Sequence, residues 1–114
     1  MTSAAAWLVK QGRVLASASV AETRHERRRG LIGEDDPQFA LIIPRCKWVH
    51  TFGVRCALDI AYLNDESQVV KLQRLAPWRL PLPVPAAHSV VEAKSGSFDR
   101  WGLRIGDTLE VRRT

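Results

Sequence analysis

Apolar residues alternate with polar or small residues over several stretches of the chain, which is typical of β-strands with two different faces. The clearest stretch covers residues 57–63, where one face carries Leu58, Ile60 and Tyr62. The opposite face carries Asp59 between two alanines, which leave room beside a carboxylate that the pattern buries. Further strands are predicted at residues 7–10, 13–17, 39–43, 68–75, 87–94 and 108–112.

Helical signals are fewer than strand signals. Ser19 and Glu22 have the spacing of a capping box, which predicts a surface helix that runs through Arg29 and stops at Gly30. Near the other end of the chain, Ser97 is expected to cap a single helical turn. The two aromatic residues of that turn lie three positions apart and should plug one end of the core.

The order of these elements predicts the fold class. About seven strands with mostly short links, one packed helix and one short helical turn indicate a mostly β (α+β) fold, a small closed or half-closed antiparallel β-barrel. The length suggests a single domain over residues 1–114. Residues 76–85 hold four of the six prolines, which excludes a helix or a central strand there. We expect a crossover loop in which Trp78 covers the edge of the core, rather than a lid or a peptide-like docking segment.

Composition and charge narrow the class of protein. The chain is 46% hydrophobic and 25% charged, which is ordinary for a globular protein. It has no apolar run near the length of a membrane span and no basic region typical of a signal peptide at its start, so we expect a cytoplasmic location. The net charge of +5 permits an acidic partner. The basic run at residues 24–29 contains no aromatic residue, so we interpret it as a solvated helix face and do not expect nucleic acid as a partner. We expect a monomer or a weak dimer.

The two cysteines, Cys46 and Cys56, are too few for a disulfide framework, and no spacing of cysteine and histidine indicates zinc. We predict that both are free, since cytoplasmic thiols are normally kept reduced. No Gly-rich phosphate loop precedes a helix, and no serine lies in a nucleophile elbow. The sequence therefore assigns no cofactor, no metal ligand and no catalytic residue.

Asp59 defines the candidate site because a buried carboxylate needs a bonded partner or a raised pKa. We expect its partner to be His50, Thr51 or Arg55. The candidate ligand-binding residues are His50, Thr51, Arg55, Asp59, Glu92 and Trp78. The cluster has three interpretations, namely a structural hydrogen bond between strands, a ligand-binding site and a catalytic site. The function that we expect is a non-catalytic binding or accessory module for a small ligand, glycan, peptide or protein partner. The alternative is a hydrolase-like enzyme that uses His50 with Asp59 or a cysteine.

Several segments together resemble a bacterial and archaeal family called domain of unknown function 192. The segments that carry the resemblance span about residues 20–111 and are Arg29-Gly30-Leu31-Ile32, residues 50–55, residues 58–63, Pro77-Trp78-Arg79, Val91-Glu92-Ala93, Gly96 and residues 101–107. The resemblance implies a small, mostly β domain with no established activity. The chain departs from the family pattern at Val54, where methionine is usual, at Ala57, where proline is frequent, and at Gly33, near which a basic residue is usual.

Overall fold

The computed structural model describes residues 4–113, which form seven strands and two short helices. In chain order these are β1 (Ala4–Lys10), β2 (Arg13–Val20), α1 (Arg24–Arg29), β3 (Ala40–Pro44), β4 (Leu58–Leu63), β5 (Val69–Leu75), β6 (Ser89–Lys94), α2 (Ser97–Trp101) and β7 (Glu110–Arg113). Each strand overlaps a predicted one. The first two strands form a hairpin, with positive φ angles of 51° at Gln11 and 77° at Gly12 in the turn.

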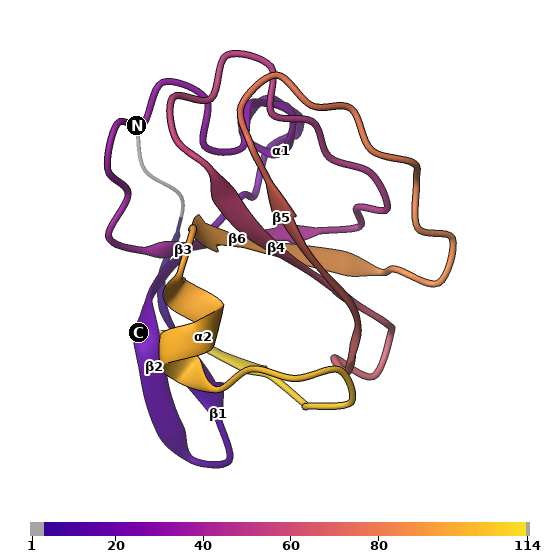
Figure 1. Ribbon diagram of the computed structural model, residues 1–114. Helices are drawn as coiled ribbons and strands as arrows, with labels where there is room; N and C mark the ends of the chain where they lie inside the picture. Colours follow the sequence, from indigo (N-terminus) through magenta and orange to yellow (C-terminus); the bar gives the residue numbers. More distant parts are fainter. Residues whose placement is uncertain (1–3, 114) are drawn as a thin grey trace.

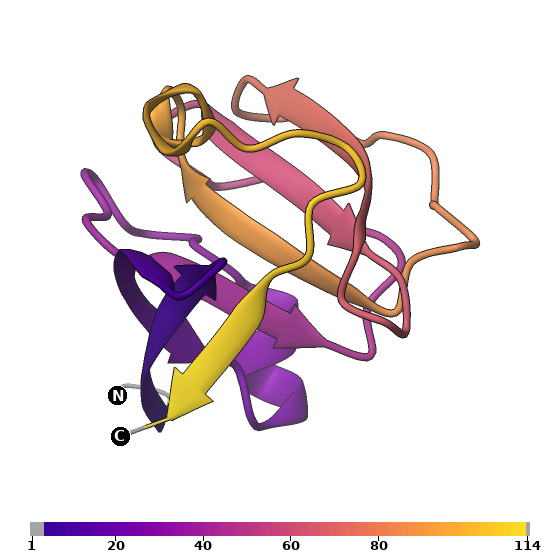
Figure 2. The same ribbon diagram turned by 90° about the horizontal axis from the view of Figure 1, so that it is seen from below.

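The seven strands form one curved sheet in the order β5-β4-β6-β3-β2-β1-β7 (Figure 1). The two ends of the sheet approach each other without closing. Gln68, just before β5, forms an isolated bridge with Thr108, and the Val69 N–H donates to the Asp107 carbonyl at 2.8 Å. Figure 2 shows the segment before β7 passing alongside the other end of the sheet. The predicted mostly β fold is therefore confirmed in its half-closed form.

The sheet is mixed rather than antiparallel throughout, because β2 and β3 run parallel. Parallel neighbours need a long crossover connection. Residues 21–39, which contain α1, provide that crossover. The helix lies on one face of the sheet, next to the end of β3 and the segment after it, where the pocket described below forms.

Helix α1 begins later than predicted. Its N-cap is Thr23, whose hydroxyl accepts from the Glu26 N–H while the Glu26 carboxylate accepts from the Thr23 N–H. Ser19 instead belongs to β2 and pairs with Leu41 of β3. The cap prediction failed because a second capping box, Thr23 with Glu26, follows the first one. Pairing with β1 and β3 extends β2 past Ser19, so the helix begins at the second box.

Two apolar clusters pack on the two faces of the sheet. Leu58, Ile60 and Tyr62 of β4 belong to the cluster under α1, whereas Ala61 and Leu63 belong to the cluster under α2. The predicted division of β4 into two faces is confirmed, and every residue of this strand is buried. Figures 1 and 2 show the two helices far apart, one at each face.

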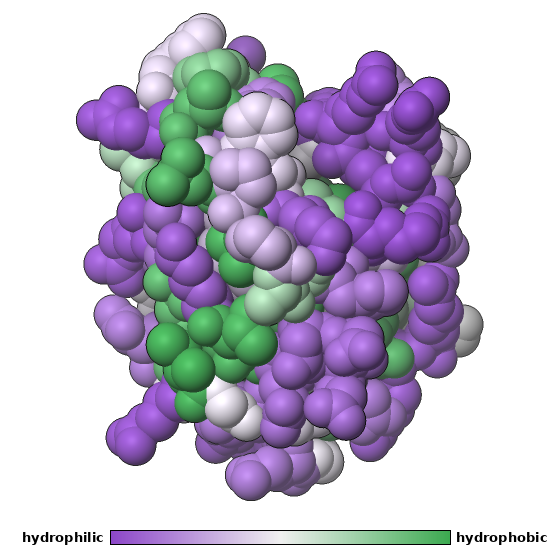
Figure 3. All heavy atoms as spheres, turned by 90° about the vertical axis from the view of Figure 1, so that its right-hand side faces the viewer, coloured by the Kyte–Doolittle hydropathy of each residue, from purple (hydrophilic) through white to green (hydrophobic). Residues whose placement is uncertain are grey.

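The proline segment, residues 76–85, is a loop, as predicted. Thr51 anchors it, because its hydroxyl donates to the Ala76 carbonyl at 2.7 Å and accepts from the Arg79 N–H at 2.8 Å. Trp78 does not cover the core as expected. Its side chain is 66% exposed and contacts Phe52, with ring centroids 5.9 Å apart. Figure 3 views the side along which this loop runs, where hydrophobic patches lie among hydrophilic side chains.

Candidate functional site

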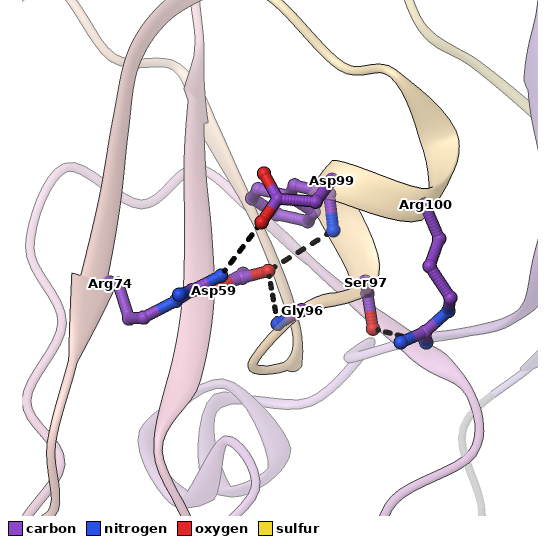
Figure 4. A network of polar contacts seen from close by, with 7 residues as sticks. Asp59, Arg74, Gly96, Ser97, Asp99 and Arg100 are labelled. Atoms are coloured by element: carbon purple, nitrogen blue, oxygen red, sulfur yellow. Dashed lines mark hydrogen bonds and ion pairs between the residues drawn. The ribbon is translucent and has the colours of Figure 1, made fainter.

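Asp59 has partners that the sequence analysis did not anticipate (Figure 4). Its Oδ1 accepts from Arg74 Nε at 3.0 Å, and its Oδ2 accepts from the Gly96 N–H at 2.9 Å and the Phe98 N–H at 3.1 Å. Asp59 is only 3% exposed, and both of its oxygens are bonded. The expectation that its partner would be one of the residues at 50, 51 or 55 was wrong.

The Asp59 carboxylate accepts hydrogen bonds from main-chain N–H groups at the start of α2. The first N–H groups of a helix have no partner within the helix, and a carboxylate from elsewhere can accept from them. Ser97, the predicted cap, makes no such bond, and its hydroxyl accepts from Arg100 instead. Phe98 and Trp101 pack as predicted, with ring centroids 5.4 Å apart. The polar network around Asp59 therefore holds α2 against β4, which matches the structural interpretation of this residue.

The other expected partners of Asp59 lie elsewhere. Arg55 forms an exposed ion pair with Asp35 at 2.9 Å, which raises the pKa of its guanidinium. Thr51 is fully buried and bonds the proline segment. His50 accepts from the Phe52 N–H through Nδ1 at 3.2 Å and contacts the Phe52 ring. Asp59, Arg55, Thr51 and His50 therefore have different partners and do not form the cluster predicted from sequence.

His50 and Glu92 are the two predicted residues that the structure brings to one pocket. This pocket, of about 630 Å³, lies between α1 and the segment after β3. Its lining residues are Arg24, Arg27, Arg28, Arg29, Gly30, Ile43, Arg45, Cys46, Trp48, Val49, His50 and Glu92. The volume is within the usual range for small-molecule sites, which is about 300–1,000 Å³.

Glu92 lies at the base of this pocket on the middle of β6. Leu41 and Ile60 flank it on the neighbouring strands, so its surroundings within the sheet are apolar. Its side chain is 3% exposed, and Oε1 has no hydrogen-bond partner. Among the side-chain nitrogen and oxygen atoms of residues 4–113, this is the one that is buried and unpaired. Buried polar atoms are nearly always bonded, so this oxygen needs an explanation.

Gly30 allows α1 to end directly over Glu92. A side-chain Cβ at this position would lie 3.0 Å from Glu92 Oε1 and 3.6 Å from Oε2. The φ angle of Gly30 is 54°, which side chains rarely adopt. Glycine therefore satisfies both the conformation of the C-cap and the close approach of a carboxylate.

Burial raises the pKa of Glu92 from 4.5 to about 7, while the Leu31 main-chain N–H partly opposes the shift. A folded pKa above the unfolded value means that the folded state binds more protons between pH 4.5 and about 7. Stability is therefore greatest below this window and falls as the pH rises through it. The carboxyl group can exist in either protonation state near neutral pH.

The thiols do not have the environment of catalytic nucleophiles. Cys46 and Cys56 are free, as predicted, and both are half-buried. Burial raises the pKa of each thiol, and the Cys46 Sγ donates to the Trp48 carbonyl at 3.2 Å. A reactive cysteine needs a lowered pKa. Within residues 4–113, no three side chains of histidine, cysteine, aspartate or glutamate are placed to hold a metal ion.

Two important residues, Arg74 and Gly30, were missed by the sequence analysis. Arg74 lies directly opposite Asp59 in the β4–β5 hairpin, and a search for opposite charges across the hairpin identifies it once the register of the two strands is known. Gly30 was interpreted as a helix stop, and its second role beside Glu92 depends on which face α1 covers. Asp59 and His50 line different pockets, so they do not form one site.

The chain is similar to proteins that have no established function. A family model described as DUF192, "Uncharacterized ACR", matches residues 6–111. A UPF0127 protein of Pyrococcus furiosus is 37% identical over 65 residues, which cover 57% of this chain and 56% of that protein. A UPF0127 protein of Thermococcus sibiricus is 30% identical over 97 residues, which cover 80% of this chain and 63% of that protein. The chain thus matches between about half and two-thirds of the length of these relatives.

Two solved structures share the fold. A protein of unknown function from Novosphingobium aromaticivorans superposes with a TM-score of 0.76 at 19% identity, over 93% of this chain and 83% of that one. A proposed transcription regulator from Sinorhizobium meliloti gives a TM-score of 0.81 at 18% identity, over 97% of each chain. Identities this low establish similarity of fold alone. Within residues 4–113, no helix has the length and apolar character needed to cross a membrane. With its match over nearly all of its length, the chain belongs to the DUF192 family of uncharacterised proteins.

Proposed function

We propose that this protein is a non-catalytic binding module that holds a small ligand in the pocket between α1 and the segment after β3. The observation that carries the proposal is the unpaired Oε1 atom of Glu92 at the base of that pocket. An unpaired buried carboxyl oxygen costs free energy in the unliganded protein. A ligand with a hydrogen-bond donor would remove that cost on binding, and this gain would be absent from a purely structural glutamate.

The surroundings of Glu92 support a binding role over a packing role. Its strand neighbours Leu41 and Ile60 could pack equally well around an apolar side chain. Gly30 adopts a positive φ angle where it approaches the carboxylate, and its lack of a side chain makes room for Oε1. Both features are consistent with a carboxyl group retained for an external partner.

Catalysis by the groups considered from the sequence has less support. Asp59 is bonded through both oxygens at the other face of the sheet, away from His50. Cys46 lines the pocket with His50, but its thiol has a raised pKa and donates to a carbonyl. Neither arrangement provides a nucleophile with an adjacent base.

The test is a titration followed by NMR of the backbone amides. The ligands are uncharged sugars, short peptides, carboxylates and phosphate esters, tested against the wild type, Glu92→Gln and Glu66→Gln. Glu66 is an exposed glutamate in the β4–β5 turn, so Glu66→Gln is a matched control for the loss of one charge. We expect saturable shifts at Gly30, Cys46 and His50 in the wild type and the control, weakened in Glu92→Gln.

Two results would contradict the proposal. One is the absence of saturable binding at these residues by every class of ligand in the panel. The other is chemical conversion of a bound ligand, detected by mass spectrometry of the recovered molecule. Reaction of Cys46 with an electrophile at neutral pH, abolished by His50→Ala, would likewise favour an enzyme over a binding module.

A further inference from the structure

We propose that the ligand of this pocket is a small anion that carries hydroxyl groups, such as a sugar phosphate or a sugar carboxylate. Its anionic group would bind the arginines of α1, and a hydroxyl would bond Oε1 of Glu92. The inference rests on the proposed function and adds the chemical class of the ligand. It derives from two features of the pocket, the charge of its rim and the nature of its base.

The rim of the pocket has a large excess of positive charge. The lining residues include five arginines and a single carboxylate, Glu92, which is buried at the base. Arg27 donates to the Glu22 carbonyl at 3.2 Å. Within residues 4–113, the side chains of Arg24, Arg28 and Arg45 have no ion pair or hydrogen bond. Guanidinium groups are well suited to phosphate and carboxylate groups because they offer several donors in one plane.

Two of these arginines, Arg24 and Arg28, lie on the exposed surface of α1. Helix α1 buries none of its residues, and Arg24 and Arg28 are exposed. Arginines four positions apart on a helix lie on the same side, so these two can approach one anionic group together. No ion pair joins either arginine to a carboxylate of residues 4–113, and a bound anion between them would reduce their mutual repulsion.

The base of the pocket favours a neutral polar group rather than a second anion. The Glu92 carboxyl is buried, and its Oε1 accepts no hydrogen bond from an arginine of the pocket. The guanidinium groups and the carboxyl group therefore recognise different parts of a ligand. A hydroxyl can donate to an ionised carboxylate and accept from a protonated one, so it fits Glu92 in either state.

The size of the pocket argues for a small molecule over nucleic acid. A volume of about 630 Å³ accommodates a sugar with one charged substituent. The residues that line it include Trp48 and His50, whose flat rings suit the apolar face of a sugar ring. A polynucleotide would need a continuous basic track with stacked aromatic residues, and α1 contains no aromatic residue other than a histidine.

The experiment compares charged and uncharged forms of the same sugar by isothermal titration calorimetry. The probes are glucose, glucose 6-phosphate, glucuronate, ribose, ribose 5-phosphate and inorganic phosphate. The protein variants are the wild type, Glu92→Gln, the double variant Arg24→Gln with Arg28→Gln, and the control Lys71→Gln with Arg104→Gln. Lys71 and Arg104 are exposed and lie outside the pocket described, so the control removes the same charge at remote positions.

We expect at least one charged sugar to bind roughly tenfold or more tightly than its uncharged form, since hydrogen bonds to charged groups are strong. The Arg24/Arg28 variant should lose this advantage, and the Lys71/Arg104 control should keep it. Glu92→Gln should weaken the binding of the charged sugar without weakening that of inorganic phosphate. The comparison of phosphates with glucuronate identifies which anionic group the arginines prefer.

Three results would overturn the inference. If uncharged sugars bind as tightly as charged ones, the ligand is neutral, and the proposed binding function stands without this inference. If inorganic phosphate binds as tightly as the sugar phosphates and Glu92→Gln has no effect on either, the rim alone binds anions. If none of these probes binds while the NMR panel finds a peptide or uncharged ligand at the pocket, the inference fails alone, and if that panel is also negative, both fail.

Discussion

Replacing Asp59 with alanine removes one acceptor that serves three donors at once. Arg74 Nε donates to Oδ1, and the N–H groups of Gly96 and Phe98 donate to Oδ2. The Arg74 side chain is half exposed, so water can replace the carboxylate around it. The two N–H groups are less accessible, and the bond to the Phe98 N–H is buried. The main cost of the substitution therefore falls on the start of α2.

The magnitude follows from these two bonds. A hydrogen bond to a charged group contributes about 1.5–3 kcal/mol, so the loss of two predicts a decrease of roughly 3 kcal/mol or more in the free energy of unfolding. Removal of a buried charged partner typically costs about 3–5 kcal/mol, which gives the same range. Asp59→Asn retains an oxygen that can accept from the N–H groups, so it should cost roughly 1–2 kcal/mol.

Urea unfolding followed by tryptophan fluorescence measures these differences. Arg74→Gln is the control that removes the ion pair while leaving both main-chain bonds intact, and it should be the mildest of the three changes. If Asp59→Ala unfolds within about 0.5 kcal/mol of the wild type, Asp59 is not the buried acceptor described here. If Arg74→Gln is as damaging as Asp59→Ala, the ion pair rather than the start of α2 carries the stability.

Four further outcomes test other parts of the structure. The free energy of unfolding of the wild type should fall by about 3 kcal/mol as the pH rises from 4.5 to about 7, whereas that of Glu92→Gln should be nearly insensitive to pH over this range. Urea melts at several pH values measure this, and equal pH slopes for the two proteins would contradict the raised pKa of Glu92. Replacing all four arginines of α1 with glutamine should leave the midpoint of urea unfolding unchanged, because this helix buries no residue. Any binding of nucleic acid by the wild type should be weak and lost in moderate salt. Tight, sequence-dependent binding would show that the helix recognises nucleic acid. Mass spectrometry after alkylation at lysis should find both Cys46 and Cys56 modified, and an intact disulfide between them would refute this. Alkylation of the folded protein at pH 7 should be slower than alkylation in urea, because burial raises the pKa of both thiols. Thr51→Val should lower the free energy of unfolding by about 1–3 kcal/mol, because the Arg79 N–H and the Ala76 carbonyl lose their hydrogen-bond partner. An unchanged urea midpoint would show that other contacts hold the proline segment.

Local pattern was sufficient to predict the strands and the division of their faces. Strict alternation over residues 57–63 placed Leu58, Ile60 and Tyr62 on one side, and the structure buries them in one cluster. This worked because the side-chain period of a strand is fixed by backbone geometry and needs no knowledge of the rest of the fold. The mostly β class followed from the number and spacing of such segments.

The partner of Asp59 depended on the pairing of strands. At the end of the β4–β5 hairpin, Leu63 pairs with Val69, and continuing that register would place Gln73 opposite Asp59. A β-bulge between Tyr62 and Leu63 shifts the register by one residue, so Arg74 takes that position instead. The sequence alone carries no clear mark of this bulge, and a shift of one residue also changes the face on which a side chain lies.

The pocket itself was decided by tertiary structure. The sequence predicted that Glu92 lies in a strand and that Gly30 ends a helix, but these two residues are 62 positions apart. They meet because the crossover between β2 and β3 lays α1 over β6. The same arrangement places the arginines of α1 around the buried carboxyl group of Glu92. The basic run that we interpreted from sequence as a solvated helix face therefore lines a pocket. The sequence determined which side chains are available for a site. The packing of one helix across the sheet determined which of them share that site, because contacts between distant segments depend on topology rather than on local periodicity.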